Sequence, residues 1–236
     1  MFTVPDISLP GILRAGSDFG WGNVGHVFGL DGTDEKSVTE ALVDARRRAP
    51  EYEAYYRRFV PGCENARMLC TASLLGVRET RRIAGDYVLD VEDFKRRAVF
   101  PDEIGRYAYP VDLHSPFPLR ERSGDGLFEK LRYRNPGESY GIPYRCLLPR
   151  GLDNVLVAGR CVSTDRYMQG SLRVQPGCHI TGQAAGAAAA LAAGRSLTTR
   201  ALPVADLQRR LIGLGAFLPN FDSRQDDVFR SVQEVR

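Results

Sequence analysis

Two side chains that can exchange protons stand two residues apart in the segment YPVDLH, residues 109–114. Residues two apart in a β-strand lie on the same face, so a strand here would place Asp112 beside His114. Such a pair could act as general acid and base toward a substrate, or its members could hold each other in a purely structural hydrogen bond. A metal site is not indicated, because the three histidines (26, 114 and 179) come with scattered acidic residues.

Arginines recur in the segment RETRRI, residues 78–83. On a polar strand they would alternate between the two faces, and one of them, Arg78, could hold a substrate carboxylate through two parallel hydrogen bonds. The alternative is a sheet face covered by ion pairs, in which Glu79 takes part.

Residues 154–193 have the pattern of a ligand cradle: an apolar run, a loop with glycines, and a segment built almost wholly of Gly and Ala. The run Asn154–Ala158 predicts a strand buried on both faces. Gly159 would let the backbone approach a bound group, and Arg160 after it is suited to pair with phosphate, unless it is a surface residue at a strand end. Pro176 and Gly177 predict a helix start, whose free N–H groups attract an anion or an electron-rich carbonyl.

Two further features of this region leave alternatives open. Cys178, in the first helical turn, could have a lowered thiol pKa and act as a redox nucleophile, or be a small packed residue. Tyr140 and Tyr144 flank a Gly-Ile-Pro turn and could line a ligand site or belong to the core.

The elements that must position these residues follow from periodicity and from Gly and Pro. Residues 1–33 predict short strands and turns, residues 37–50 a helix ending at Pro50, and residues 51–60 a second, aromatic-rich helix. We expect a strand or short helix over 67–77, a polar strand over 78–85, a capped short helix over 90–97, and short strands with Pro turns from 99 to 150, including a hairpin-like stretch at 128–134. An amphipathic helix over 204–214 precedes a polar tail.

A literal G-x-G-x-x-G occurs at residues 20–25. The dinucleotide-binding version of this motif joins an apolar strand to a helix, and neither pattern flanks it here. We therefore predict a turn or a strand at this place.

Composition limits the classes of function. The chain has 236 residues, 43% of them hydrophobic, and a net charge of +3, so it reads as a soluble globular protein without a basic surface for nucleic acid. No run is apolar enough to predict a membrane span, and the first residues carry no secretion signal. Five cysteines without a C-x-x-C pair favour reduced thiols and a cytoplasmic location.

Three segments, together with residues 154–193, resemble one known family: GVRETRRIAGDYVLD (76–90), FPDEIGRYAYPVDLH (100–114) and YGIPYRCLLPRGLDNVLVAGR (140–160). They are similar to the C-terminal half of FAD-dependent oxidoreductases of the glutathione-reductase-like flavoprotein superfamily. The resemblance implies a mixed α/β fold with a substrate-domain portion over 1–150, the last strand and the Ala-rich helix of the FAD domain over 151–200, and a C-terminal helix and tail over 201–236. It implies FAD as cofactor, with these residues around it: Ala158, Gly159, Arg160, Arg173, Val174, Gln175, Gly177 and Cys178. Asp112, His114 and Arg78 would serve a small polar organic substrate.

The chain departs from that family in one respect. The strand, true G-x-G-x-x-G and helix that bind the ADP half of FAD are not found in this sequence. We therefore expect either a naturally short or split protein, for which a second chain supplies that half, or a truncated product of a longer gene. The complete enzyme would transfer hydride between flavin and substrate. The alternative is a non-catalytic flavoprotein remnant or partner subunit that does not bind FAD alone.

Overall fold

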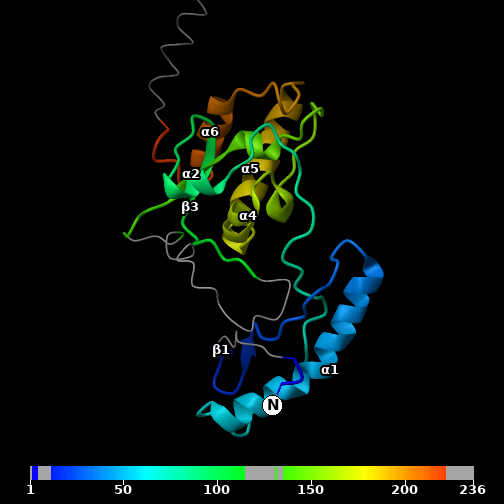
Figure 1. Ribbon diagram of the computed structural model, residues 1–236. Coiled ribbons are helices and arrows are strands. Elements are labelled where there is room, and N and C mark those ends of the chain that lie inside the picture. Colours follow the sequence, from blue (N-terminus) through cyan, green and yellow to red (C-terminus); the bar gives the residue numbers. More distant parts are fainter. Residues whose placement is uncertain (1, 5–11, 115–130, 132–134, 222–236) are drawn as a thin grey trace, which may run out of the picture. The chain divides into compact units, whose positions relative to one another are not determined.

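The computed structural model describes residues 2–4, 12–114, 131 and 135–221 (Figure 1). Its helices and small antiparallel sheets confirm a mixed α/β fold. The elements in chain order are β1 (Ile12–Arg14), β2 (Gly20–Gly22), α1 (Glu35–Phe59), α2 (Val91–Lys95), β3 (Glu103–Tyr107), β4 (Tyr140–Pro143), the 3₁₀ turns η1 (Tyr144–Leu147) and η2 (Gly159–Cys161), α4 (Arg166–Leu172), α5 (Gln175–Gly194) and α6 (Val204–Gly213). The chain forms two compact units, one of Met1–Thr80 with His114–Gly124 and one of Arg81–Leu113 with Asp125–Arg236.

The first unit contains the long helix α1, blue to cyan in Figure 1, which runs through Pro50. The sequence predicted two helices with a break there, and this is wrong. Pro50 removes one backbone hydrogen bond, at a cost of about 3 kcal/mol. Aromatic packing beyond it offsets that loss, because Tyr52 and Tyr56 are buried and the Phe2 ring lies 5.0 Å from that of Tyr52.

The first unit also contains the antiparallel pair β1–β2, in which Leu13 faces Trp21. The G-x-G-x-x-G at residues 20–25 therefore begins in a strand, and no helix follows it before α1. This confirms that the motif lacks the strand–turn–helix context of a dinucleotide site.

The second unit begins with the short helix α2, whose capping box was predicted. The Asp90 carboxylate accepts from the N–H groups of Glu92 and Asp93, and the Asp93 carboxylate accepts from the Asp90 N–H. Asp165 connects this helix with α4, because its carboxylate accepts from Val91 N at 3.0 Å and from Met168 N at 2.7 Å.

The sheet of the second unit is the antiparallel pair β3–β4. Glu103 is 2% exposed and accepts from Arg106 Nη1 at 2.6 Å and from Phe100 N at 3.1 Å. A Cβ on Gly141 of β4 would lie 2.0 Å from Glu103 Oε1, so this ion pair requires a glycine opposite it.

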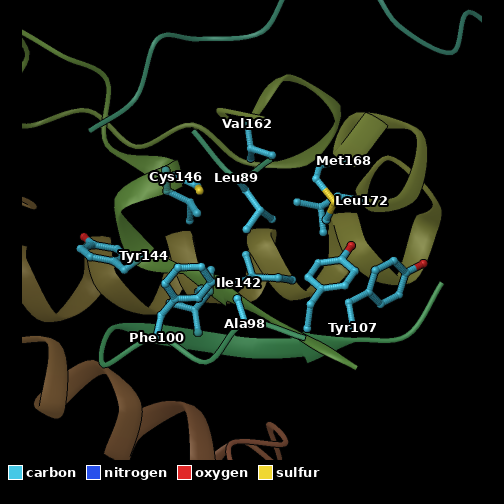
Figure 2. Close-up of a cluster of buried hydrophobic side chains, with 14 of the residues drawn as sticks. Leu89, Ala98, Phe100, Tyr107, Ile142, Tyr144, Cys146, Val162, Met168 and Leu172 are labelled. Carbon is cyan, nitrogen blue, oxygen red and sulfur yellow. The ribbon is translucent and has the colours of Figure 1, made fainter. Parts of the chain in front are cut away.

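Figure 2 shows the core of this unit, where side chains from β3, β4, η1 and α4 converge. Tyr140 and Tyr144 belong to it. The Tyr140 hydroxyl lies 2.8 Å from Ser171 Oγ, and that of Tyr144 donates to Thr199 O at 2.9 Å. Of the two alternatives for these tyrosines, the core position is confirmed. The fully buried large side chains of the core include Leu89, Phe94, Ile104, Leu131, Ile142, Leu147, Met168, Leu172, Leu207 and Leu211.

Helices α5 and α6 form where the sequence predicted them. Ala184, Ala188 and Ala192 of α5 are buried, and their small side chains let the helix pack closely on β3 and α6. The contact with β3 is tight, because a Cβ on Gly105 would lie 2.6 Å from Ile180 Cγ2.

Several predicted strands do not form. Residues 67–77, 78–85, 109–114 and 154–158 have no regular structure apart from a single bridge between Gly85 and Pro149. A strand needs backbone partners along its length. Among the described residues, the N–H groups of 154–158 make one backbone hydrogen bond, from Val157 to Leu147 O at 2.9 Å. Most of the hairpin-like stretch 128–134 and the tail from 222 on lie outside the described residues.

None of the helices in the described ranges combines the length and apolar character needed to cross a membrane. Nor do the described His, Cys, Asp and Glu residues gather in a group of three or more that could hold a metal ion.

Candidate functional site

The candidate site lies where η2 meets the first turns of α5. Gly159 has φ +80°, a backbone conformation that favours glycine, and a Cβ built on it would find no atom within 4 Å. Arg160 follows directly and is exposed. The turn Ala158–Gly159–Arg160 therefore presents open backbone next to a guanidinium group.

Thr181 fixes this turn to α5. Its side chain is fully buried, and its Oγ1 accepts from Gly159 N at 3.0 Å. The same oxygen lies 3.0 Å from Cys178 O and 3.2 Å from Gly177 O, and it donates to these helix carbonyls. One hydroxyl group thus holds the glycine turn against the first two turns of the helix.

The N-terminus of α5 is partly open. Val174 is its N-cap and has no side-chain cap bond, and the residues at the first two helical positions, Gln175 and Pro176, are exposed. The Cys178 N–H donates to Val174 O at 3.1 Å. In the first turn, Pro176 has no N–H, so the donors that could face an anion are those of Gln175 and Gly177.

Gly177 is buried, and the structure gives it a packing role. A Cβ there would lie 2.4 Å from Leu172 O, at the end of α4. The absence of a side chain lets α4 and α5 meet. The contact of Gly177 with the cofactor, which the family resemblance implied, stays a prediction beside this packing role.

Cys178 is half-buried at the α4–α5 junction, where its Sγ lies 3.2 Å from Arg173 O. Burial raises the pKa of this thiol above its ordinary value, although the positive charge of Arg160 acts in the opposite direction. The hypothesis of a lowered thiol pKa at the helix start is therefore wrong. Desolvation of the thiol outweighs the charge of Arg160.

Arg173 and Asp112 are brought together by the fold. Arg173 Nη2 donates to Asp112 O at 3.0 Å and lies 3.3 Å from Asp112 Oδ2. The Arg173 side chain is 11% exposed and that of Asp112 is 41% exposed, so the carboxylate is held yet reachable from solvent. A predicted cofactor residue thus orients a predicted catalytic residue.

His114 and Arg78 belong to the other unit. The His114 ring stacks on that of His26 with the centroids 5.5 Å apart. Asp112 and His114 were expected to share a strand face, but residues 109–114 form no strand and the two units divide between Leu113 and His114. Arg78 is half-buried in a segment without regular structure, whereas the sequence predicted a strand there.

Sequence reasoning missed one residue of the site, Thr181. Thr181 carries the one hydroxyl group in the α5 segment of Gly, Ala and other residues, and this contrast could have marked it.

Comparison with known proteins identifies a family for this chain. The family model described as FAD dependent oxidoreductase matches residues 13–211, which include most of both units and the site at η2 and α5. No curated protein and no solved structure matches the chain significantly. A match over most of its length shows that the chain belongs to the FAD dependent oxidoreductase family.

Proposed function

We propose that this chain is the flavin-facing half of an FAD-dependent oxidoreductase of the glutathione-reductase-like superfamily, acting on a small polar organic substrate. The ADP-binding half of the FAD site would lie outside these 236 residues, on a second polypeptide or on a longer chain. The observation that carries the proposal is the Gly159 turn, held by the Thr181 hydroxyl against the start of α5 and followed by Arg160. Backbone without a side chain, one guanidinium and a helix N-terminus suit a flat, anionic group.

The residues present fit FAD. Cβ atoms at Gly159, Gly182 and Gly186 would meet no atom within 4 Å, so a ring system or a phosphate could approach these positions. Arg160 would pair with phosphate, while Ala158 and Gly159 would contact the ribityl region. Val174 and Gln175 would offer the positive end of α5 to the ring. When bound, FAD supplies hydride transfer at its flavin ring.

The remaining candidates take proposed roles on the substrate side. Asp112, held by Arg173, could accept or give a proton, and Arg173 itself would keep the loop before α5 in place. His114 and Arg78 stay proposed as a proton-transfer group and a carboxylate-binding group. The division into a substrate portion over 1–150, an FAD portion over 151–200 and a C-terminal region, and the cytoplasmic location, belong to the same proposal.

One observation favours the alternative of a subunit that binds no FAD alone. Pro176 takes one of the first helical positions of α5 and has no N–H to offer to an anion. The site has fewer donors than a helix start without proline, so most of the affinity would come from the ADP-binding half.

FAD binding to the purified chain tests the proposal, measured by flavin fluorescence with and without an ADP-binding half from a full-length family member. We expect clear binding only with both halves, and a loss of about 10-fold in affinity for Arg160→Gln, because one charge-assisted bond to phosphate disappears. Arg166→Gln is the matched control, since Arg166 is also exposed and lies six residues away. Equal affinity of the Arg160 variant and wild type would remove Arg160 from the site, and no binding in either mixture would support the non-catalytic alternative.

A further inference from the structure

Two cysteines lie on the two elements that form the candidate site, Cys161 in η2 and Cys178 in the first turn of α5. Both belong to the second unit and both are free thiols, Cys161 exposed and Cys178 half-buried. Helix α4 separates them in the chain, so the fold brings them to one place and local spacing does not.

The Thr181 hydroxyl holds the backbone near one cysteine against the backbone of the other. Its Oγ1 lies 3.0 Å from Gly159 N and 3.0 Å from Cys178 O, so these two backbone atoms are separated by no more than both lengths together, about 6 Å. Cys161 follows Gly159 by two residues in a 3₁₀ turn, in which each residue advances the chain by about 2 Å. The Cys161 backbone therefore lies beside the first turns of α5.

The two side chains also interact through their charges. Burial is the largest influence that raises the pKa of the Cys178 thiol, and a negative charge on Cys161 raises it further, while Arg160 lowers it. Charges at a protein surface are largely screened beyond about 8 Å at physiological salt. The influence of Cys161 on Cys178 therefore indicates that both sulfur atoms lie on one small patch of the site.

Neither sulfur is held firmly in its present position. Cys161 Sγ lies 3.6 Å from Ala158 O, and a thiol is a weak donor. Cys178 Sγ lies 3.2 Å from Arg173 O. Both side chains can turn between staggered positions about the Cα–Cβ bond. The turn before Cys161 has room to adjust, because a Cβ at Gly159 would meet no atom within 4 Å.

We propose that Cys161 and Cys178 are a redox modification site, at which a reversible disulfide forms by exchange with glutathione disulfide. The exposed Cys161 thiolate attacks one sulfur of that disulfide, forms a mixed disulfide and releases one glutathione thiolate. The Cys178 thiolate then attacks the Cys161 sulfur, the protein disulfide forms, and the second glutathione thiolate leaves.

The two protein thiols are oxidised in this exchange, and their two protons pass to the two glutathione thiolates. Cys178 is suited to the second step. Its burial excludes a large disulfide from solution, whereas a neighbouring mixed disulfide is present at a high effective concentration. The product would join the Gly159 turn covalently to α5, beside Arg160. This inference does not depend on FAD binding.

The test uses the full native chain, incubated with oxidised glutathione at about pH 8 and then capped with iodoacetamide. Trypsin separates the two cysteines into the peptides 161–166 and 174–195, each with one cysteine. Mass spectrometry should find these two peptides joined as the main oxidised product, and dithiothreitol should separate them. In Cys178→Ser the mixed disulfide of Cys161 with glutathione should be at least about 10-fold more abundant than in wild type, because the second thiol is missing. Cys70→Ser is the control, since Cys70 is exposed but belongs to the first unit, and it should behave as wild type.

Three results would overturn the inference: no joined peptides in the wild-type chain, a mixed disulfide of Cys161 that is as abundant in wild type as in Cys178→Ser, or joined peptides that come from a covalent dimer on non-reducing electrophoresis. The wild-type peptide map decides the question even where a variant does not fold. Cys161→Ser tests the order of the steps, because Cys178 should then stay reduced. Glutathione on Cys178 in that variant would contradict the assigned roles.

Discussion

The Cys178 thiol shows how competing effects decide a single residue. Its position in the first turn of α5 and the charge of Arg160 both favour the thiolate. Burial at the α4–α5 junction opposes them and raises the pKa. The sequence displays the helix start and the arginine, but desolvation depends on how two helices meet. The chemistry of this residue can therefore be stated only when the packing of α4 against α5 is known.

We expect Cys178 to react with iodoacetamide at least about 10-fold more slowly than the exposed Cys161 and Cys70, because a raised pKa leaves less thiolate and burial limits access. Mass spectrometry of the native protein after timed labelling at about pH 8 measures each site. Labelling of all five cysteines after denaturation is the control for detection. If Cys178 reacts as fast as Cys161 in the native state, the pKa argument is wrong.

At the scale of elements, α4 and α5 can approach each other because residue 177 is a glycine. Gly177→Ala would place a methyl group 2.4 Å from the Leu172 carbonyl oxygen, and a backbone atom cannot move aside as a side chain can. We expect a loss of about 1–3 kcal/mol in the free energy of unfolding, measured by urea denaturation.

Gly186→Ala is the matched control in the same helix, since its Cβ would meet no atom within 4 Å. Alanine favours a helix over glycine by about 1 kcal/mol, so this variant should be neutral or more stable. Opposite signs for the two variants would separate packing from helix propensity. Equal effects would contradict the packing role of Gly177.

Helices formed as predicted where the local sequence signals and the packing favoured the same structure. Capping at Asp90 predicted α2, and the Pro-Gly start predicted α5. Prediction from the sequence failed where an element depends on partners far away in the chain. Residues 154–158 have the pattern of a buried strand, but in the described chain their N–H groups make one backbone hydrogen bond. Pro50 was given too much weight, because the aromatic contacts beyond it could not be seen in the sequence. Strand pairing and aromatic packing are long-range terms that periodicity does not contain.

The same distinction holds for the candidate site. Gly159 and Arg160 lie beside the start of α5, as their order in the chain had indicated. The hydrogen bond from Gly159 N to Thr181 Oγ1 joins residues 22 positions apart. The ion pair of Arg173 with Asp112 joins residues 61 positions apart. Nothing in local spacing predicts such contacts.

At the scale of the whole molecule, acid should loosen the second unit through Asp206, whose side chain is 6% exposed and links α6 to the end of α5. Burial alone would raise the pKa of Asp206, but hydrogen bonds from Arg195 and Arg209 outweigh it, so the pKa lies below its ordinary value. A carboxyl group with a depressed pKa in the folded state binds fewer protons than in the unfolded chain. Its contribution is therefore complete above the unfolded pKa of about 3.9 and is lost as the pH falls through the lower folded value.

Asp206→Asn should lower the free energy of unfolding by about 2 kcal/mol at neutral pH, because the neutral amide cannot hold both guanidinium groups. The difference from wild type should begin to shrink as the pH falls below about 4, where the carboxyl group of the unfolded wild-type chain becomes protonated, and should be smallest below the lower folded pKa. Urea denaturation of both proteins across this range measures the difference, and the comparison cancels the acid response of the other carboxylates. Asp153→Asn is the control, since the Asp153 side chain is 78% exposed and its pair with Arg200 spans 3.4 Å. A difference that stays constant down to low pH would show that Asp206 stabilises the α5–α6 junction by packing alone, without its charge.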